Sequence, residues 1–242
     1  MIKTHWNENV LEICIDRAEK KNALSHVMYD DLTEAIAGAD RVPTCQAIIV
    51  YGAGGIFTAG ADIKDFQKKR DGSDSPAVKY LRQLAVTKCP LIAAVEGFAI
   101  GIGSTMLQHF DFVYTTANTR FRMPFTELGL CPEGGSTILM ERLVGLRKAM
   151  QWLVECQPFD GTEAVQTGFA TALAEEGKTL ERARATASNL EKLHGDAVRQ
   201  SKHMLKYTNQ SALTAAIDYE VQVFNEQINS DYAQKVFSKF LS

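Results

Sequence analysis

The stretch CPEGGST, residues 131–137, places Glu133 between a proline and two glycines. Two interpretations fit this pattern. Proline is favoured at the first position of a helix and the helix dipole stabilises a nearby acid, so Glu133 could simply begin the apolar helix that follows. A carboxyl group held in a tight turn could instead serve as a catalytic base. The rest of the chain has to decide between them.

Two glycine-rich turns, GGIFTAGADI (residues 54–63) and GFAIGIGST (residues 97–105), each follow an apolar segment. Glycine permits positive φ and lets backbone N–H groups approach a ligand closely. One N–H group from each turn, directed at the same point, would form an oxyanion hole; the alternative is two ordinary strand-to-helix connections. The second turn does not match the GxGxxG dinucleotide fingerprint, and the first lacks the GK[ST] of a P-loop.

Thiol and metal chemistry have little support in the sequence. The chain has an odd number of cysteines, with no CxxC pair and no Cys/His cluster at metal-binding spacing, so we expect free thiols in a reducing compartment and no metal. Cys131 stands beside Glu133, but a free cysteine is usually a small buried hydrophobe. The histidines form no triad pattern, and His109 is expected to be structural. The cysteines are Cys14, Cys45, Cys89, Cys131 and Cys156.

The composition excludes several classes of protein. The chain has 242 residues, of which 45% are hydrophobic and 23% charged, with a formal net charge of -3. This balance suits a globular protein and disfavours a general nucleic-acid binder, which needs a basic face. The N-terminus lacks the apolar core of a signal peptide, and no apolar run approaches the ~20 residues that span a membrane. We expect a cytoplasmic protein with no nucleic-acid or membrane partner.

Alternating apolar segments, glycine turns and helical patterns predict an α/β arrangement of stacked strand–helix units. Strand, glycine turn and helix occur twice, around residues 46–66 and 91–109. Beyond residue 134 the pattern is nearly all helical, apart from an edge segment at 172–176. We expect residues 1–188 to form the core and the site, and residues 189–242 a helical region that covers a site or a neighbour. The expected strands are 2–15 (two, joined by a turn), 45–52, 91–97 and 111–116, and the expected earlier helices are 24–40, 62–70, 77–87 and 104–110.

Five segments in register resemble the crotonase (enoyl-CoA hydratase/isomerase) superfamily. They are FTAGADIK at 57–64, PLIAAVEGFAIGIG at 90–103, FDFVY at 110–114, FRMPFTELG at 121–129 and PEGG at 132–135. The likeness extends over about residues 10–170. It implies a spiral of ββα turns followed by C-terminal helices, assembly as a trimer or hexamer, and an acyl-CoA thioester substrate with no separate cofactor.

The resemblance also implies which residues bind the substrate. The thioester carbonyl would accept backbone N–H bonds from Ala59 and Ile102, and the loop at 59–63 would lie along the coenzyme A. Asp62 has the alternative of capping the helix that follows it. Lys64, Lys68 and Lys69 could meet phosphates or simply form a solvated helix face. The implied substrate-binding residues are Ala59, Gly60, Ala61, Asp62, Ile63 and Gly101, with Phe66, Met106, Phe125 and Leu130 around the acyl tail.

Two glutamates that hold a water in the family's hydratases are both missing. The matching positions are Thr105 in GIGST and Phe125 in MPF. Hydration needs one group to take a proton from water and another to give one to the α-carbon, so the usual parts are absent. The peroxisomal-type Δ3,Δ2-enoyl-CoA isomerases also lack both acids. They carry one catalytic glutamate in a PEG turn about eight residues after the second position, which here is Glu133.

We therefore expect an enoyl-CoA isomerase of the fatty-acid β-oxidation type. Glu133 would move a proton from C2 to C4, with Phe125 and Leu130 making it more basic. Pro132 is expected to begin a helix with Glu133 in its first turn; the helix dipole would then oppose that basicity. Glu127 in TELG is an alternative acid. The other possibilities are hydration or another crotonase-type reaction, and an inactive paralogue that binds acyl-CoA or, against its net charge, RNA.

Overall fold

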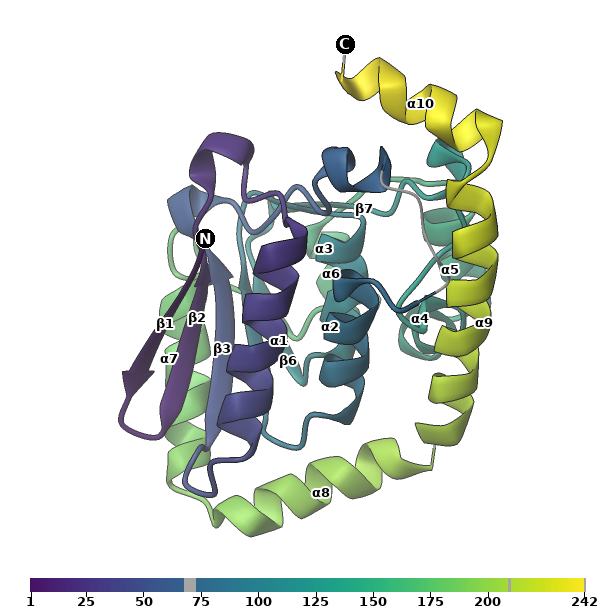
Figure 1. Ribbon diagram of the computed structural model, residues 1–242. Helices are drawn as coiled ribbons and strands as arrows, with labels where there is room; N and C mark the ends of the chain where they lie inside the picture. The colour runs from purple at the N-terminus through teal and green to yellow at the C-terminus, as the bar shows by residue number, and fades with distance from the viewer. Residues whose placement is uncertain (68–72, 209, 242) are drawn as a thin grey trace.

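The computed structural model describes residues 1–67, 73–208 and 210–241 (Figure 1). A six-stranded sheet has the order β1-β2-β3-β4-β6-β9, and a three-stranded sheet has the order β5-β7-β8. In the larger sheet β1 is antiparallel to β2 and all other neighbours are parallel, which confirms the expected α/β class. Its strands are β1 (Ile2–Asn7), β2 (Val10–Ile15), β3 (Ala47–Gly52), β4 (Leu91–Val95), β6 (Phe112–Thr115) and β9 (Ala172–Leu173).

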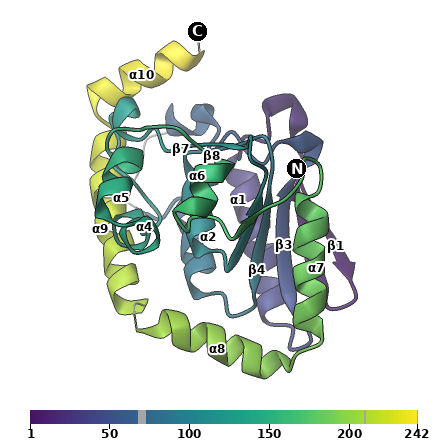
Figure 2. The ribbon, with the colours of Figure 1, turned by 180° about the vertical axis from the view of Figure 1, so that it is seen from behind.

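Strand β3 shows why the larger sheet is apolar on both faces. Ile48 and Val50 point into a core that includes residues of α1 (His26–Asp40) and α2 (Pro76–Val86). Ala47 and Ile49 point the other way, into a cluster with Ala183 and Ala187 of α7 (Thr179–Glu191). Alternate residues of a strand face opposite sides, so helices on both sides require a continuous apolar run. Figures 1 and 2 show α1 and α2 on one face and α7 on the other.

The smaller sheet was not among the expected elements. It consists of β5 (Phe98–Ile100), β7 (Arg120–Arg122) and β8 (Phe159–Asp160), which are too short to show an alternating pattern. Strand β5 occupies part of the segment expected to be a glycine-rich turn, and it brings the two glycine turns together. A Cβ atom on Gly60, whose φ is +88°, would lie 2.4 Å from the carbonyl oxygen of Ile100. Glycine at this position therefore permits the contact.

Three C-terminal helices wrap around one side of the molecule (Figure 1). Helix α8 (Gly195–Tyr207) crosses below the strands, α9 (Gln210–Ile228) packs against α2 and α4 (Ser136–Val144), and α10 (Asp231–Leu241) lies over the short helix η3 (Ile63–Gln67). The expected division between residues 188 and 189 falls inside α7. Within the described ranges, no helix is both long and apolar enough to cross a membrane. The remaining elements are α3 (Ile102–Thr105), η4 (Met106–His109), η5 (Thr126–Leu128), α5 (Leu146–Leu153) and α6 (Gly161–Gln166), with η1 (Ala18–Lys20) and η2 (Ala53–Gly55).

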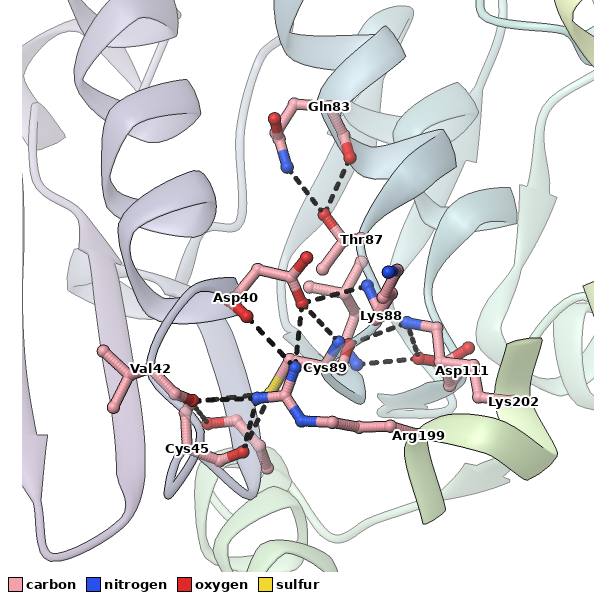
Figure 3. Close-up of polar contacts among 12 residues, drawn as sticks. Asp40, Val42, Cys45, Gln83, Thr87, Lys88, Cys89, Asp111, Arg199 and Lys202 are labelled. Carbon is pink, nitrogen blue, oxygen red and sulfur yellow. Dashed lines mark hydrogen bonds and ion pairs between the residues drawn. The ribbon is translucent and has the colours of Figure 1, made fainter. Parts of the chain in front are cut away.

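Helix α8 is anchored mainly through backbone carbonyl groups (Figure 3). The Arg199 guanidinium donates hydrogen bonds to the carbonyl oxygens of Asp40 (3.1 Å), Val42 (3.1 Å) and Cys45 (2.8 Å). It also pairs with the Asp40 carboxylate at 3.2 Å. The Cys45 thiol lies 3.4 Å, sulfur to sulfur, from that of Cys89. One arginine therefore fixes α8 to the connection that leads into β3.

Two lysines of α8 converge on Asp111. Lys202 Nζ lies 2.6 Å and Lys206 Nζ 2.8 Å from its carboxylate oxygens. Asp111, which directly precedes β6, also accepts the N–H of Leu91 in β4 at 2.8 Å. Burial and the charge of Lys206 lower the pKa of Lys202, and the attraction of Asp111 opposes this. Asp111 is thus the counter-charge for a lysine that is only 8% exposed.

We expect Asp111→Asn to destabilise the protein by roughly 3–5 kcal/mol, because it leaves the Lys202 ammonium buried without its partner. The matched control is Asp218→Asn, which breaks the more exposed pair between Asp218 and Arg82 and should cost about 1 kcal/mol or less. Urea denaturation followed by circular dichroism measures both. Equal losses for the two variants would contradict this account of α8.

Candidate active site

A cavity of about 430 Å³ opens between the glycine turns, the segment after β7 and helix α9. Its wall is mostly apolar, and the acids in it are Glu127 and Glu133. Residues of α2 and α9 also line it. Among the expected substrate-binding residues, those that line it are Ala59, Gly60, Ala61, Ile63, Gly101, Phe125 and Leu130; further lining residues include Ile100, Ile102, Pro124, Val221 and Phe224.

Glu133 lies in a turn and not in a helix, so the expectation that Pro132 begins a helix was wrong. Helix α4 starts at Ser136 with Gly135 as its N-cap. Gly134 and Gly135 have φ values of +74° and +79°, a left-handed conformation that glycine adopts readily. A Cβ atom on Gly135 would also lie 2.3 Å from a methyl carbon of Leu213. The two glycines place Glu133 ahead of the helix, where its side chain reaches the cavity.

Neighbouring side chains fix the backbone of this turn. The Gly134 carbonyl oxygen lies 3.1 Å from Gln108 Nε2 and 2.8 Å from His109 Nε2. The Ser136 hydroxyl donates to the carbonyl oxygen of Glu133. Burial lowers the pKa of His109 to about 4, so the ring is neutral and donates from Nε2. His109 therefore has the structural role expected of it, and the turn is held without use of the Glu133 carboxyl group.

The carboxyl group of Glu133 accepts a hydrogen bond from the Thr105 hydroxyl. Burial raises the pKa of Glu133 to about 8; the Thr105 hydrogen bond opposes this shift, and the negative charge of Glu220 adds to it. Glu133 retains some accessible surface although it lies deep in the protein, because that surface faces the cavity. Phe125 and Leu130, which line the same cavity, are 6% and 2% exposed. The apolar enclosure expected from the sequence is therefore present.

The acid at the N-terminus of α4 is Glu220 of α9, which sequence reasoning missed. Its carboxylate accepts the N–H of Gly135 at 2.6 Å, the N–H of Thr137 at 2.9 Å and the Thr137 hydroxyl at 2.6 Å. It is 3% exposed. The only sequence signal is an acid in register with Leu213 and Ile217 on the buried face of a helix. Such an acid needs partners that a pattern within the helix cannot identify.

Ala59 does not offer the free N–H group that was expected of it. Its N–H donates to the carbonyl oxygen of Lys21 at 3.0 Å. The N–H of Ala61, two residues later, has no acceptor within the described part of the chain. Ala61 forms a parallel β-bridge with Leu24, in which Leu24 bonds to the Gly60 carbonyl and the Asp62 N–H on either side of Ala61. The N–H of Ala61 itself therefore points away from Leu24. The first glycine turn thus presents Ala61 rather than Ala59 as a donor.

Ile102 keeps the free N–H group that was expected of it. It occupies the first position of α3, where helix geometry leaves N–H groups without an internal acceptor. The Gly101 carbonyl accepts from Ser104 (2.9 Å) and Thr105 (3.0 Å), and no acceptor for Ile102 exists among the residues described. Ile102 and Ala61 both line the cavity. The arrangement can therefore supply one donor from each glycine turn.

Two expected substrate-binding residues do not line the cavity. Asp62 accepts the Lys64 N–H at 3.2 Å and pairs with Arg17 at 2.9 Å, so it has the capping role that was the alternative for it. Met106 is fully buried and accepts a contact from the Tyr80 hydroxyl at 3.5 Å, in the core beneath the site. The side chain of Phe66 and the residues Lys68 and Lys69 lie outside the described part.

The remaining candidates for chemistry are accounted for by their contacts. Glu127 pairs with Arg122 at 2.5 Å, and these two side chains, 49% and 41% exposed, line the cavity. Burial raises the pKa of the Cys131 thiol to about 12, and the carboxylates of Glu220 and Glu133 add to this, so it is protonated and a poor nucleophile. No cluster of three or more His, Cys, Asp or Glu residues in the described ranges could hold a metal ion.

We expect Glu133→Gln to change the pH dependence of stability. A carboxyl group whose pKa is about 8 in the folded state and 4.5 in the unfolded state stays protonated to a higher pH when the protein is folded. The free energy of unfolding of the parent protein should therefore fall as pH rises from about 5 to 8. Glutamine does not ionise, so the variant does not lose stability in this way. Relative to the parent protein, its free energy of unfolding should therefore increase by on the order of 3–5 kcal/mol between pH 5 and pH 9. Urea denaturation across this range measures it, with Glu127→Gln as the exposed control; parallel profiles for all three proteins would contradict the raised pKa.

Comparison with known proteins finds similarity over nearly the whole chain. Residues 5–242 match the family described as enoyl-CoA hydratase/isomerase. The solved structure of Pseudomonas aeruginosa OdaA is 35% identical with a TM-score of 0.95, covering 99% of this chain and 98% of that one. The crystal structure of a putative enoyl-CoA hydratase/isomerase from Acinetobacter baumannii is 32% identical with a TM-score of 0.93, covering 97% of this chain and 100% of that one. These similarities confirm the crotonase fold.

Curated relatives carry both hydratase and isomerase names. A probable enoyl-CoA hydratase of Mycobacterium leprae is 27% identical over 231 residues, which are 95% of this chain and 90% of the relative. Enoyl-CoA delta isomerase 2 of Rattus norvegicus is 29% identical over 218 residues, which are 87% of this chain and 56% of the relative. With its fold, its cavity and a family match over nearly its whole length, the chain belongs to the enoyl-CoA hydratase/isomerase family.

Proposed function

We propose that this protein is a Δ3,Δ2-enoyl-CoA isomerase that uses Glu133 as both base and acid. The observation that carries the proposal is the Glu133 carboxyl group, which faces an apolar cavity and has no ion-pair partner among the described residues. The other acid in the cavity wall, Glu127, is paired with Arg122 at the exposed edge. Coenzyme A is part of the substrate, and the reaction needs no separate cofactor.

The first step breaks the C2–H bond of a 3-enoyl-CoA. The Glu133 carboxylate takes the proton, and the bonding electrons pass through the carbonyl carbon to the thioester oxygen, which gives a dienolate. A base with a pKa of about 8 is a strong proton acceptor, yet roughly a tenth of it is ionised at pH 7. The apolar wall around Glu133 therefore favours this step.

The second step returns the same proton at C4. The dienolate electrons flow back from oxygen, a double bond forms between C2 and C3, and the protonated Glu133 donates to C4. A single carboxyl group placed between the two carbons serves both steps, so the net reaction consumes no proton. The negative charge on oxygen between the steps requires N–H donors, for which we propose Ala61 and Ile102. Each such donor is typically worth ~3–4 kcal/mol in the transition state.

Hydration is the rival reaction, since several relatives are named as hydratases. It requires a second group to handle the water proton, and the two positions that match the hydratase acids are Thr105 and Phe125. Thr105 donates its hydrogen bond to Glu133, and Phe125 forms part of the apolar wall. These residues support proton transfer within the substrate and disfavour a bound, activated water.

We expect Glu133→Gln to lower kcat/KM for 3-enoyl-CoA by roughly 10²- to 10⁴-fold, because glutamine cannot accept the C2 proton. In the parent protein kcat/KM should rise with pH to a midpoint near the pKa of about 8 of the free site. The assay follows formation of 2-enoyl-CoA by chromatography. Glu127→Gln is the control and should change the rate little. Parent-like turnover by Glu133→Gln would refute the mechanism, and hydration of 2-enoyl-CoA faster than isomerisation would favour the rival.

We also propose the homotrimer or hexamer that the resemblance implies. Leu146, Met150 and Val154 lie four residues apart along α5 and its C-cap, and they are 59%, 49% and 49% exposed. Such a stripe of exposed apolar side chains is typical of an association surface. Light scattering should give three or six times the chain mass of 26.7 kDa. Met150→Lys should reduce that mass, and a parent protein of monomer mass would contradict the proposal.

A further inference from the structure

Glu220 connects the helix that walls the cavity to the turn that carries Glu133. Its two carboxylate oxygens accept three hydrogen bonds from Gly135 and Thr137, at the start of α4. Those two residues are 85 and 83 positions away in the chain. The carbonyl oxygen of Glu220 also accepts the Cys131 thiol, at 3.7 Å. Glu220 therefore has bonds on both sides of Glu133 in the sequence.

The next residue of α9 faces the cavity. Val221, Phe224 and Asn225 contribute to its wall, while Glu220 points away from the cavity into the N-terminus of α4. The three hydrogen bonds from Gly135 and Thr137 to the Glu220 carboxylate are called the Glu220 clamp. A displacement of α9 that changes the cavity wall must therefore also move this clamp. Because a base is effective only within a narrow geometry, such coupling matters for Glu133.

The two carboxyl groups have unequal surroundings. Glu220 has three hydrogen-bond donors and the positive end of the α4 dipole, whereas Glu133 has the single Thr105 donor. Ionisation therefore occurs first at Glu220, even though burial raises the pKa of that group as well. The charge on Glu220 in turn disfavours ionisation of Glu133. A pair of acids whose surroundings differ in this way divides into one anion and one proton carrier.

We propose that Glu220 is a positioning residue, which holds the turn of Glu133 through the N-terminus of α4 and, by its negative charge, keeps Glu133 the proton-carrying member of the pair. The inference rests on the proposed function only for its kinetic readout. Its structural readout, the titration of Glu133, is independent of any substrate.

Few other titratable groups face this pair. From the turn itself comes Cys131, whose thiol is protonated, and from η4 comes His109, which is neutral. Helix α3 contributes only the hydroxyl of Thr105. Within the described part of the chain, no lysine or arginine forms an ion pair with either Glu133 or Glu220. The charge that acts on Glu133 is thus that of Glu220.

The test compares Glu220→Gln with Glu226→Gln, the same change at an exposed position of α9. The titration of Glu133 is followed by ¹³C NMR of protein labelled at glutamate carboxyl carbons, with Glu133→Gln to assign the signal. We expect Glu220→Gln to shift the Glu133 midpoint to lower pH, because a neighbouring negative charge is lost. We also expect kcat for 3-enoyl-CoA to fall roughly 10- to 100-fold with a smaller change in KM, because one of the two accepting oxygens becomes an amide nitrogen, which cannot accept a backbone N–H.

Glu220→Asp separates the two roles. It keeps the charge but shortens the clamp, so the Glu133 midpoint should stay closer to that of the parent protein while kcat falls. An unchanged midpoint and an unchanged kcat in Glu220→Gln, both equal to those of Glu226→Gln, would overturn the inference. Should Glu220→Gln fail to fold, Thr137→Val and Thr137→Ser decide it. Loss of the hydroxyl should lower kcat several-fold and serine should restore it, whereas equal rates for the two would count against the clamp.

Failure of the proposed function gives a different result from failure of this inference. If the protein does not isomerise 3-enoyl-CoA but the Glu133 midpoint falls in Glu220→Gln, the isomerase proposal is refuted and the electrostatic coupling of the two acids is supported. If the protein isomerises 3-enoyl-CoA through Glu133 but neither the Glu133 midpoint nor kcat changes in Glu220→Gln, the isomerase proposal stands and the positioning role of Glu220 is refuted.

Discussion

Glu133 keeps a carboxyl group in an apolar cavity, where ionisation is opposed by burial and assisted by the Thr105 hydroxyl. A group in such surroundings is costly to charge, and this cost is the source of its basicity. A strong ion pair would remove the cost and the basicity together. The backbone of Glu133 has to be fixed by other means, which here are the bonds of Gln108, His109 and Ser136 to the turn.

The site also depends on segments that are far apart in the chain. Glycine turns after β3 and β5 bring free N–H groups to one side of the cavity, while α9 closes another side and caps α4. Gly60 lets the two turns approach, and Gly135 lets Leu213 of α9 pack against the start of α4. Small residues at these contacts bring the Glu133 carboxyl group and the residues Ala61 and Ile102 to one apolar space of about 430 Å³.

Much of the fold could be predicted from the chain itself, because short apolar segments indicate β2, β3, β4 and β6 and helical periodicity indicates α1 and α2. The smaller sheet could not, since strands of two or three residues have no readable period. The sequence also identified Glu133 as the candidate acid and Phe125 and Leu130 as its apolar neighbours. It misplaced the first backbone donor, because the direction of an N–H depends on pairing between Leu24 and Ala61. It missed Glu220, whose partners lie on another helix.

The anchoring of α8 has a consequence for how this sequence can change over time. Arg199 and Lys202 bind the carbonyl oxygens of Val42, Cys45 and Cys89, which every amino acid possesses. Substitutions at those three positions leave the acceptors in place, so their side chains are free to drift within the limits of packing. Selection on this contact acts instead on the donors and on the acidic side chains that pair with them. Relatives should thus preserve the course of α8 while their residues at the acceptor positions diverge.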